Sequence, residues 1–158
     1  FTQSVSYPGT VDEVVAMYLT PAYLERRFGQ FVVEGSATVS VEGERVSFAG
    51  TVRPELIPAA AARFVKSDLR VSFTEEWATN EAGATSRTSV TVDGAPVSVE
   101  ATSTLTPAEA GSVRDVTGNV SVRVPLLGGR IEKEAVAHLG RVVEREQALA
   151  AQWLEEHR

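Results

Sequence analysis

The apolar and polar residues of this chain follow different periods in successive segments. Residues 1–7 alternate, with Phe1, Val5 and Tyr7 on one face, and the run stops at Pro8-Gly9. That pattern predicts a strand followed by a turn. Between residues 10 and 28 the apolar residues recur at helical spacing, with an interruption at Thr20-Pro21. Because proline fits the first turn of a helix, we expect two short helices joined at a corner.

From Gln30 to about Arg123 the period changes to two, the spacing of a strand with one buried face. Glycine-containing turns separate the strands, and Asp93-Gly94 is typical of a tight hairpin. The stretch 54–68 breaks the pattern with Pro58 and a run of alanines, which predicts a short helix across the sheet opening. The strands are expected over residues 31–41, 46–52, 69–77, 85–92, 97–105 and 113–124.

After Gly128-Gly129 only Gly140 weakens a helix before the last residue, Arg158. About thirty residues of helix would be on the order of 45 Å long, the length of a small domain. The expected order is one strand, two short helices, about six antiparallel strands and one long helix. Segregated strands and helices predict an α+β fold, with a curved antiparallel sheet of about seven strands around the terminal helix. We expect residues 1–158 to form a single domain.

Composition narrows the classes of function. The net charge is −6 and the basic residues are scattered, which argues against a nucleic-acid partner. No apolar run approaches the roughly twenty residues of a spanning helix, and the N-terminus lacks a basic-then-apolar signal. We therefore expect a cytoplasmic protein without an integral membrane segment. The absence of cysteine excludes disulfides and thiolate chemistry, and two histidines without metal-ligand spacing predict no metal site and no cofactor.

A family resemblance follows from three features. The element order, the strand that carries Trp77 and the run Val-Pro-Leu-Leu-Gly-Gly-Arg-Ile-Glu at residues 124–132 resemble the START/polyketide-cyclase (SRPBCC) superfamily, and within it a bacterial branch known only as a domain of unknown function. The resemblance implies a helix-grip fold with a hydrophobic cavity for a lipid, sterol, polyketide or similar ligand. In a minority of relatives it implies a cyclase or dehydratase reaction.

Two carboxylates occupy positions expected to be apolar. Glu146 falls inside the stripe of the terminal helix that includes Leu139, Val142, Leu149 and Trp153. Glu75 alternates with Val71, Phe73 and Trp77 on a strand, unless a bulge at Glu75-Glu76 turns it outward. If both face inward, they could act as a cavity acid/base pair with raised pKa values. Alternatively, Glu146 reaches solvent or pairs with an arginine on the sheet.

The aromatic residues of the sheet, the segment across its opening and the helix are expected to converge on the cavity. Small residues on the inward faces, such as Gly50 and Ala101, would leave space for a ligand. No nucleophile elbow or phosphate loop occurs, and no catalytic residue is predicted. The predicted ligand-binding residues are Phe48, Phe64, Phe73, Glu75, Trp77, Leu139, Val142 and Glu146.

Three functions compete on this basis. The first is binding or carriage of a small hydrophobic ligand, without catalysis, in a cavity between the sheet and the terminal helix. The second is a cyclase or dehydratase that uses cavity carboxylates such as Glu75 and Glu146. The third is a protein-interaction module that docks through its sheet and helix, and a homodimer is compatible with all three. We expect the first.

Overall fold

The computed structural model describes residues 1–57, 62 and 68–158. Within these residues seven strands form one antiparallel sheet in the order β1-β7-β6-β5-β4-β3-β2. The strands are β1 (Thr2–Tyr7), β2 (Thr38–Glu42), β3 (Arg45–Thr51), β4 (Arg70–Asn80), β5 (Gly83–Asp93), β6 (Val97–Ala108) and β7 (Gly111–Val122). The helices are α1 (Val11–Tyr18), α2 (Pro21–Phe28) and α4 (Gly128–Glu156), with 3-10 turns η1 (Gly29–Phe31) and η2 (Pro54–Leu56).

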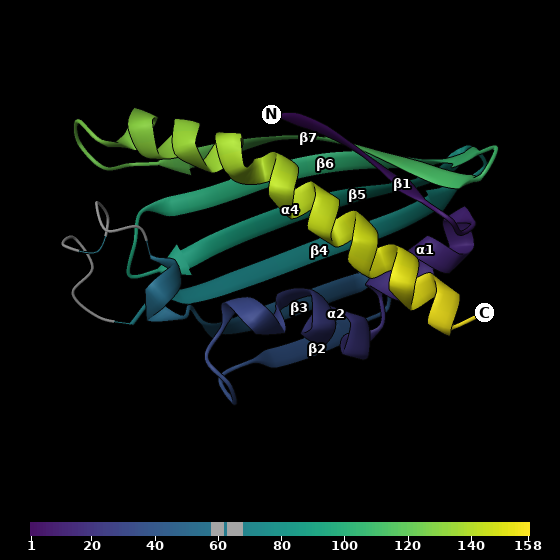
Figure 1. Ribbon diagram of the computed structural model, residues 1–158, viewed down its shortest axis with the longest axis horizontal. Coiled ribbons are helices and arrows are strands. Elements are labelled where there is room, and N and C mark those ends of the chain that lie inside the picture. Colours follow the sequence, from purple (N-terminus) through teal and green to yellow (C-terminus); the bar gives the residue numbers. More distant parts are fainter. Residues whose placement is uncertain (58–61, 63–67) are drawn as a thin grey trace.

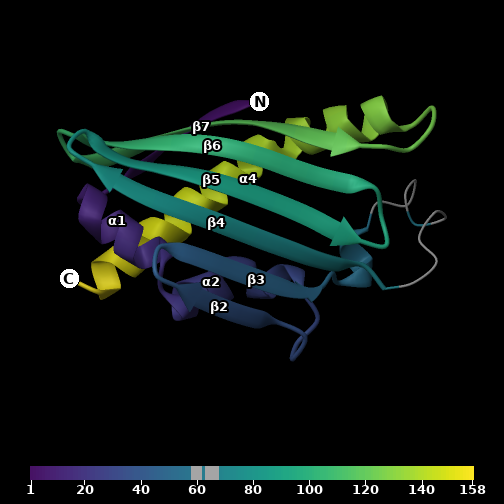
Figure 2. The same ribbon diagram turned by 180° about the vertical axis from the view of Figure 1, so that it is seen from behind.

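The helices share one side of the sheet. Figure 1 shows α4 running diagonally across that side, with α1 and α2 beside its C-terminal end. Seen from behind in Figure 2, the strands lie in front and these three helices lie beyond them. The long helix packs mainly along β7 and β1. The prediction of an α+β helix-grip fold is therefore confirmed.

Local sequence sets the position of the first helix. The Thr10 hydroxyl accepts a hydrogen bond from the backbone N–H of Glu13, and the Glu13 carboxylate accepts one from the N–H of Thr10. This reciprocal cap satisfies two N–H groups that a helix start would otherwise leave unpaired. The predicted corner at Thr20-Pro21 is confirmed, because α2 begins at Pro21.

Two predicted boundaries are wrong. The strand expected from Phe31 begins only at Thr38, because residues 29–31 form η1 and Gly35 turns the chain with a φ of 81°. The strand expected over residues 97–105 continues to Ala108, so the turn before β7 is shorter than expected. The short helix predicted from Pro58 onward falls on residues 58–61 and 63–67, which lie outside the described residues; η2 precedes it.

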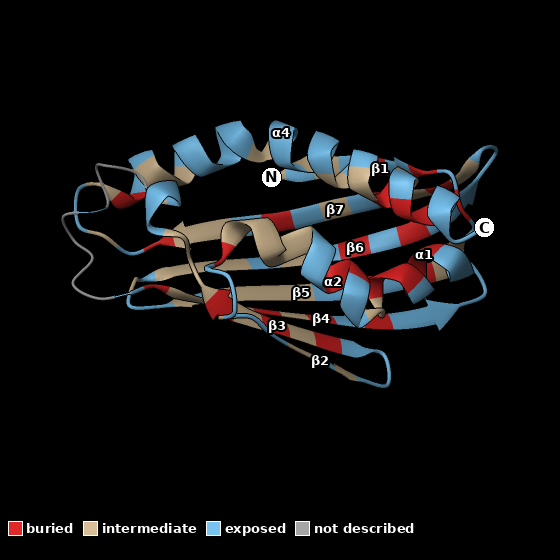
Figure 3. Cartoon of the chain, turned by 60° about the horizontal axis from the view of Figure 1, so that its bottom comes forward, coloured by how far each residue is buried: buried red, intermediate tan, exposed pale blue. Residues whose placement is uncertain are grey.

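The buried residues divide into two clusters. The larger lies where α1, α2 and the last turns of α4 meet the sheet, and includes Tyr18, Tyr23, Trp77 and Trp153. The smaller lies between α2 and strands β3 and β4, and includes Phe48. Figure 3 shows many of the buried positions near the C-terminus, whereas the first half of α4 is exposed or partly exposed apart from its first residue, Gly128. The first half of the predicted helix stripe is therefore not part of a closed core.

Candidate functional site

An apolar pocket of about 210 Å³ lies on the helix side of the sheet. It is lined by Phe28, Phe31, Val32, Phe48, Val52, Val71, Phe73 and Val90. The strand register aligns part of this lining, because Phe48, Phe73 and Val90 are direct neighbours on β3, β4 and β5. The Phe28 ring packs against both phenylalanines, with centroid distances of 5.1 and 4.6 Å. Helix α2 thus supplies one wall and the sheet supplies the floor.

A glycine allows this pocket wall to approach the sheet. A Cβ atom added at Gly50 would lie 2.7 Å from the side chain of Val32, closer than real Cβ contacts allow. Val32 joins the sheet edge through a bridge to Val52. A larger residue at Gly50 would therefore displace a wall of the pocket.

Beside the pocket, β4 carries a carboxylate that is completely enclosed. Glu75 is 1% exposed. Its Oε2 accepts hydrogen bonds from Thr88 at 2.7 Å and from Arg114 at 3.1 Å, and its Oε1 accepts one from the Trp77 indole at 3.0 Å. The register between β4 and β5 is continuous at Glu75 and Glu76, so no bulge turns the side chain outward. Glu75 faces the helices.

The guanidinium of Arg114 on β7 is held from several sides. Besides Glu75, it donates to the hydroxyl groups of Ser103 at 2.9 Å and Ser86 at 3.1 Å. Its Cζ lies 4.9 Å from the Tyr18 ring centroid and 4.8 Å from that of Trp77. These contacts compensate for the cost of enclosing a charge that is only 4% exposed.

A second ion pair joins α2 to α4. Nη2 of Arg27 lies 2.6 Å from Oε1 of Glu146. The same carboxylate oxygen accepts a hydrogen bond from the Tyr18 hydroxyl at 3.0 Å. The Tyr7 and Tyr18 hydroxyls are 2.7 Å apart, and since the Tyr18 proton points to Glu146, Tyr7 donates to Tyr18. The contacts around Glu146 therefore link β1, α1, α2 and α4.

The two ion pairs meet at Arg27. Its Nη1 lies 3.8 Å from Oε1 of Glu75, so the four charges of Arg27, Arg114, Glu75 and Glu146 form one cluster. We call these four residues the charge cluster. With two cations and two anions, its formal charge is zero.

Burial and charge act in opposite directions on these groups. Burial alone would raise the pKa of Glu75, but Arg114, Arg27 and the hydrogen bonds outweigh it and lower that pKa below its usual range. Burial would lower the pKa of Arg27, but Glu146 and Glu75 raise it. For Tyr18, burial and the charge of Glu146 both raise the pKa. The expected raised pKa of a cavity acid is therefore wrong for Glu75, because that expectation did not include its arginine partners.

Comparison with known proteins places the chain in a family. Residues 2–154 match the family described as "Protein of unknown function (DUF2505)". The chain belongs to that family. Uncharacterized proteins of Mycobacterium tuberculosis and Mycobacterium bovis are each 26% identical to it over 166 residues, covering 98% of this chain and 95% of theirs. The family match agrees with the predicted branch of unknown function.

Solved structures share the fold at low identity. A protein from Chromobacterium violaceum aligns with a TM-score of 0.57 and 14% identity over 96% of both chains. A START superfamily protein from Mycobacterium smegmatis aligns with a TM-score of 0.51 and 12% identity, covering 94% of this chain and 96% of that one. These matches support a START-like fold for this DUF2505 member.

The structure brings together only some of the predicted ligand-binding residues. Phe48 and Phe73 line the apolar pocket, and Glu75 and Glu146 belong to the charge cluster beside it. Trp77 lies apart from the pocket, in the larger core cluster, where its ring stacks on Tyr18 at 5.4 Å.

The remaining predicted residues lie at the margin of the site or outside the described residues. Val142 is 50% exposed and lines a smaller void between α2 and α4. Leu139 is partly buried on α4, and it is not among the residues that line either space. Phe64 falls outside the described residues. Val142 and Leu139 therefore add no lining to the apolar pocket.

Several residues of the site were missed from the sequence. Arg27 follows Tyr23 by four positions and Leu24 by three, so its helical spacing places it on the buried face of α2. Arg114 alternates with Ser112 and Val116 on the inward side of β7. The spacing of both arginines was visible in the sequence. An arginine on an apolar face indicates a site only when its partner carboxylate is known, and the sequence does not show that partner.

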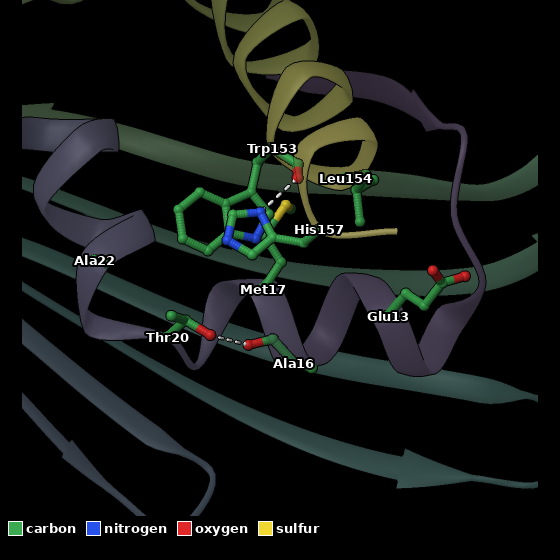
Figure 4. A pocket seen from close by; sticks show the side chains of 8 residues that line it. All are labelled: Glu13, Ala16, Met17, Thr20, Ala22, Trp153, Leu154 and His157. Carbon is green, nitrogen blue, oxygen red and sulfur yellow. Dashed lines mark hydrogen bonds between the residues drawn. The ribbon is translucent and has the colours of Figure 1, made fainter.

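A further pocket lies on the outside of the helical end. About 440 Å³ in volume, it is bordered by α1, α2 and the end of α4. In Figure 4, Trp153 and His157 lie together on one side, and Glu13 lies apart from them. The His157 ring stacks on Trp153 at 3.9 Å, and its Nδ1 is 2.8 Å from the Trp153 carbonyl. The packing of the end of α4 on α1 explains how these side chains are arranged.

Among residues 1–57, 62 and 68–158, no three histidine or acidic side chains are grouped as a metal ion would require. Within the same ranges, no helix is both long enough and apolar enough to span a bilayer.

Proposed function

We propose that this DUF2505 member binds a small hydrophobic ligand in the apolar pocket between α2 and strands β3–β5. The observation that carries the proposal is the pocket itself, about 210 Å³ with eight apolar lining residues. Water in such a space finds few hydrogen-bond partners, so an apolar molecule replaces it favourably. A dry engineered cavity of about 150 Å³ accepts benzene, so this pocket has room for a ligand of similar or slightly larger size.

The sheet floor supports the same proposal. The row of neighbours that includes Phe73 and Val90 continues through Val99 on β6 to Val120 on β7. Phe73 is buried. Val90, Val99 and Val120 remain partly exposed, although their row faces the helix side of the sheet. An apolar floor that the described residues do not fully cover extends beyond the pocket, and a longer ligand could contact it.

The cyclase or dehydratase alternative receives less support. A general acid needs a pKa near the working pH, and the surroundings of Glu75 shift its pKa in the opposite direction. Both oxygens of Glu75 already accept hydrogen bonds. Binding therefore requires fewer rearrangements than acid catalysis at this position.

The test is a titration of isotope-labelled protein with cumene, followed by amide NMR shifts. We expect saturable shifts that concentrate around the pocket. In Val90→Phe the added ring occupies most of the pocket, so the dissociation constant should rise at least tenfold. The matched control is Thr91→Phe, because Thr91 is the next residue of β5 and is exposed. Absence of saturable binding to the wild type would overturn the proposal, as would equal binding by Val90→Phe.

A further inference from the structure

Arg27 belongs to the charge cluster and also contacts the pocket lining. Its Cζ lies 4.7 Å from the ring centroid of Phe28 and 5.2 Å from that of Phe73, and both rings line the apolar pocket. A void of about 50 Å³ adjoins the pocket, sharing Phe28 and Phe31 with it, and is lined by Arg27 and Glu146 as well. The guanidinium therefore lies at the boundary between the apolar pocket and the charge cluster.

One donor group of this guanidinium is unused. Nη1 of Arg27 is buried and has no hydrogen-bond partner among the described residues. Its nearest carboxylate oxygen, on Glu75, is 3.8 Å away, beyond hydrogen-bond distance. A buried donor without a partner is unfavourable by about 1–3 kcal/mol, so an acceptor atom placed there gains more than it would elsewhere in the pocket.

The charge count determines which acceptor fits. The charge cluster contains two arginines and two glutamates within ion-pair distance, so its charges already cancel. An additional carboxylate would be an unmatched anion near Glu146 and Glu75, and burying such a charge is costly. A neutral oxygen can accept a hydrogen bond from Nη1 without disturbing this balance.

We propose that the ligand carries a neutral hydrogen-bond acceptor, such as a ketone or ester carbonyl oxygen, which is bound by Arg27 while the apolar body of the ligand fills the pocket. This inference rests on the proposed function and names the class of ligand. Arg27 would then be a specificity-determining residue, since a hydrocarbon of equal size leaves its Nη1 unpaired.

Arg145 is the further cation that lines the small void. Its side chain is exposed and donates a hydrogen bond to Gln30, and its Cζ lies 5.8 Å from the Phe31 ring centroid. Water and salt screen an exposed charge, so Arg145 contributes little to holding an anion inside the void. Its position makes a carboxylate ligand the competing outcome of the test.

Three probes of nearly equal size separate these possibilities: acetophenone has a carbonyl oxygen, cumene is a hydrocarbon, and benzoate is an anion. The three probes also differ in hydrophobicity, so their dissociation constants cannot be compared directly. The informative quantity is how each dissociation constant changes when Arg27 is removed. The variant combines Arg27→Met with Glu146→Gln, so both charges of the Arg27–Glu146 ion pair are removed together. The reference is Glu146→Gln alone, which retains Arg27. We expect acetophenone to lose about tenfold in affinity relative to cumene.

A second measurement uses the wild-type protein and does not depend on folding of the variants. Acetophenone labelled with ¹³C at the carbonyl carbon should show a downfield shift of that resonance on binding, as a hydrogen-bonded ketone does. Saturable binding without that shift, or an unchanged ratio of acetophenone to cumene affinity, overturns the inference and leaves the proposed function intact. Tighter binding of benzoate than of acetophenone to the wild-type protein, whose charge cluster is neutral, also overturns it, in favour of an anionic ligand. If none of the probes binds, the proposed function itself is wrong.

Discussion

Replacing Glu75 with glutamine tests whether the charge cluster stabilises the fold. The substitution keeps the size of the side chain but removes its charge, and leaves Arg114, 4% exposed, without the carboxylate 3.1 Å from its Nη2. Removing one partner of a buried ion pair typically costs about 3–5 kcal/mol, because the remaining charge stays desolvated. For a urea m value of about 2 kcal/mol/M, the unfolding midpoint should fall by roughly 2 M.

The neighbouring residue provides a matched control. Glu76 pairs with Arg45 at 2.8 Å, but these two side chains are 55% and 54% exposed. Exposed pairs contribute about 0–1 kcal/mol, so Glu76→Gln should change the free energy of unfolding by less than about 1 kcal/mol. The assay is equilibrium urea unfolding at pH 7, followed by far-ultraviolet circular dichroism. If Glu75→Gln costs no more than Glu76→Gln, the cluster does not contribute as argued.

The pH dependence follows from the same ion pair. Because the folded state lowers the pKa of Glu75, its contribution to stability is complete above the ordinary carboxyl pKa of about 4.3. It is lost as the pH falls below that value and through the folded-state pKa, since the unfolded chain takes up the proton first. The difference in unfolding free energy between wild type and Glu75→Gln should therefore shrink on acidification. A difference that stays constant down to acid unfolding would contradict the lowered pKa.

Three further substitutions test local features. Tyr18→Phe removes the hydroxyl that donates to Glu146 and should cost about 1–3 kcal/mol in chemical denaturation; no loss would show that this hydrogen bond is replaced by water. Thr10→Ala removes the cap of α1 and should cost about 1 kcal/mol, with Thr10→Ser retaining most of the stability. Gly111→Ala places a Cβ atom 2.1 Å from a backbone oxygen of β1, whereas the same change at Gly43 meets nothing within 4 Å. The first should therefore lower the melting temperature clearly more than the second, and equal effects would mean that β1 moves aside freely.

Local patterns predicted most of the fold. Alternation in residues 1–7 and the turn at Asp93-Gly94 each depend on near neighbours in sequence, and both are confirmed. The expected strand from Phe31 was wrong because alternation continues through a segment that Gly35 turns. A period of two therefore shows that a strand is possible, whereas a positive φ at one glycine decides where it begins.

The site was less predictable because its contacts join distant segments. Alternation placed Glu75 on the inward face, which the register confirms. Its partner Arg114 lies 39 positions later, and Glu146 lies 128 positions after Tyr18. No spacing rule pairs such residues without the strand order. The direction of the Glu75 pKa shift depends on these partners, so sequence alone led to the opposite expectation.

The position of β1 has a consequence for how the chain folds. β1 pairs with β7, and the backbone nitrogen of Phe1 donates a hydrogen bond to the carbonyl oxygen of Gly118, 117 residues away. During synthesis β1 therefore cannot reach its place at the sheet edge until β7, which ends at Val122, has emerged. Contacts of such large sequence separation slow folding and leave strand edges unpaired meanwhile. This first strand, rather than the long helix, is where we expect chaperone dependence and aggregation during expression to originate.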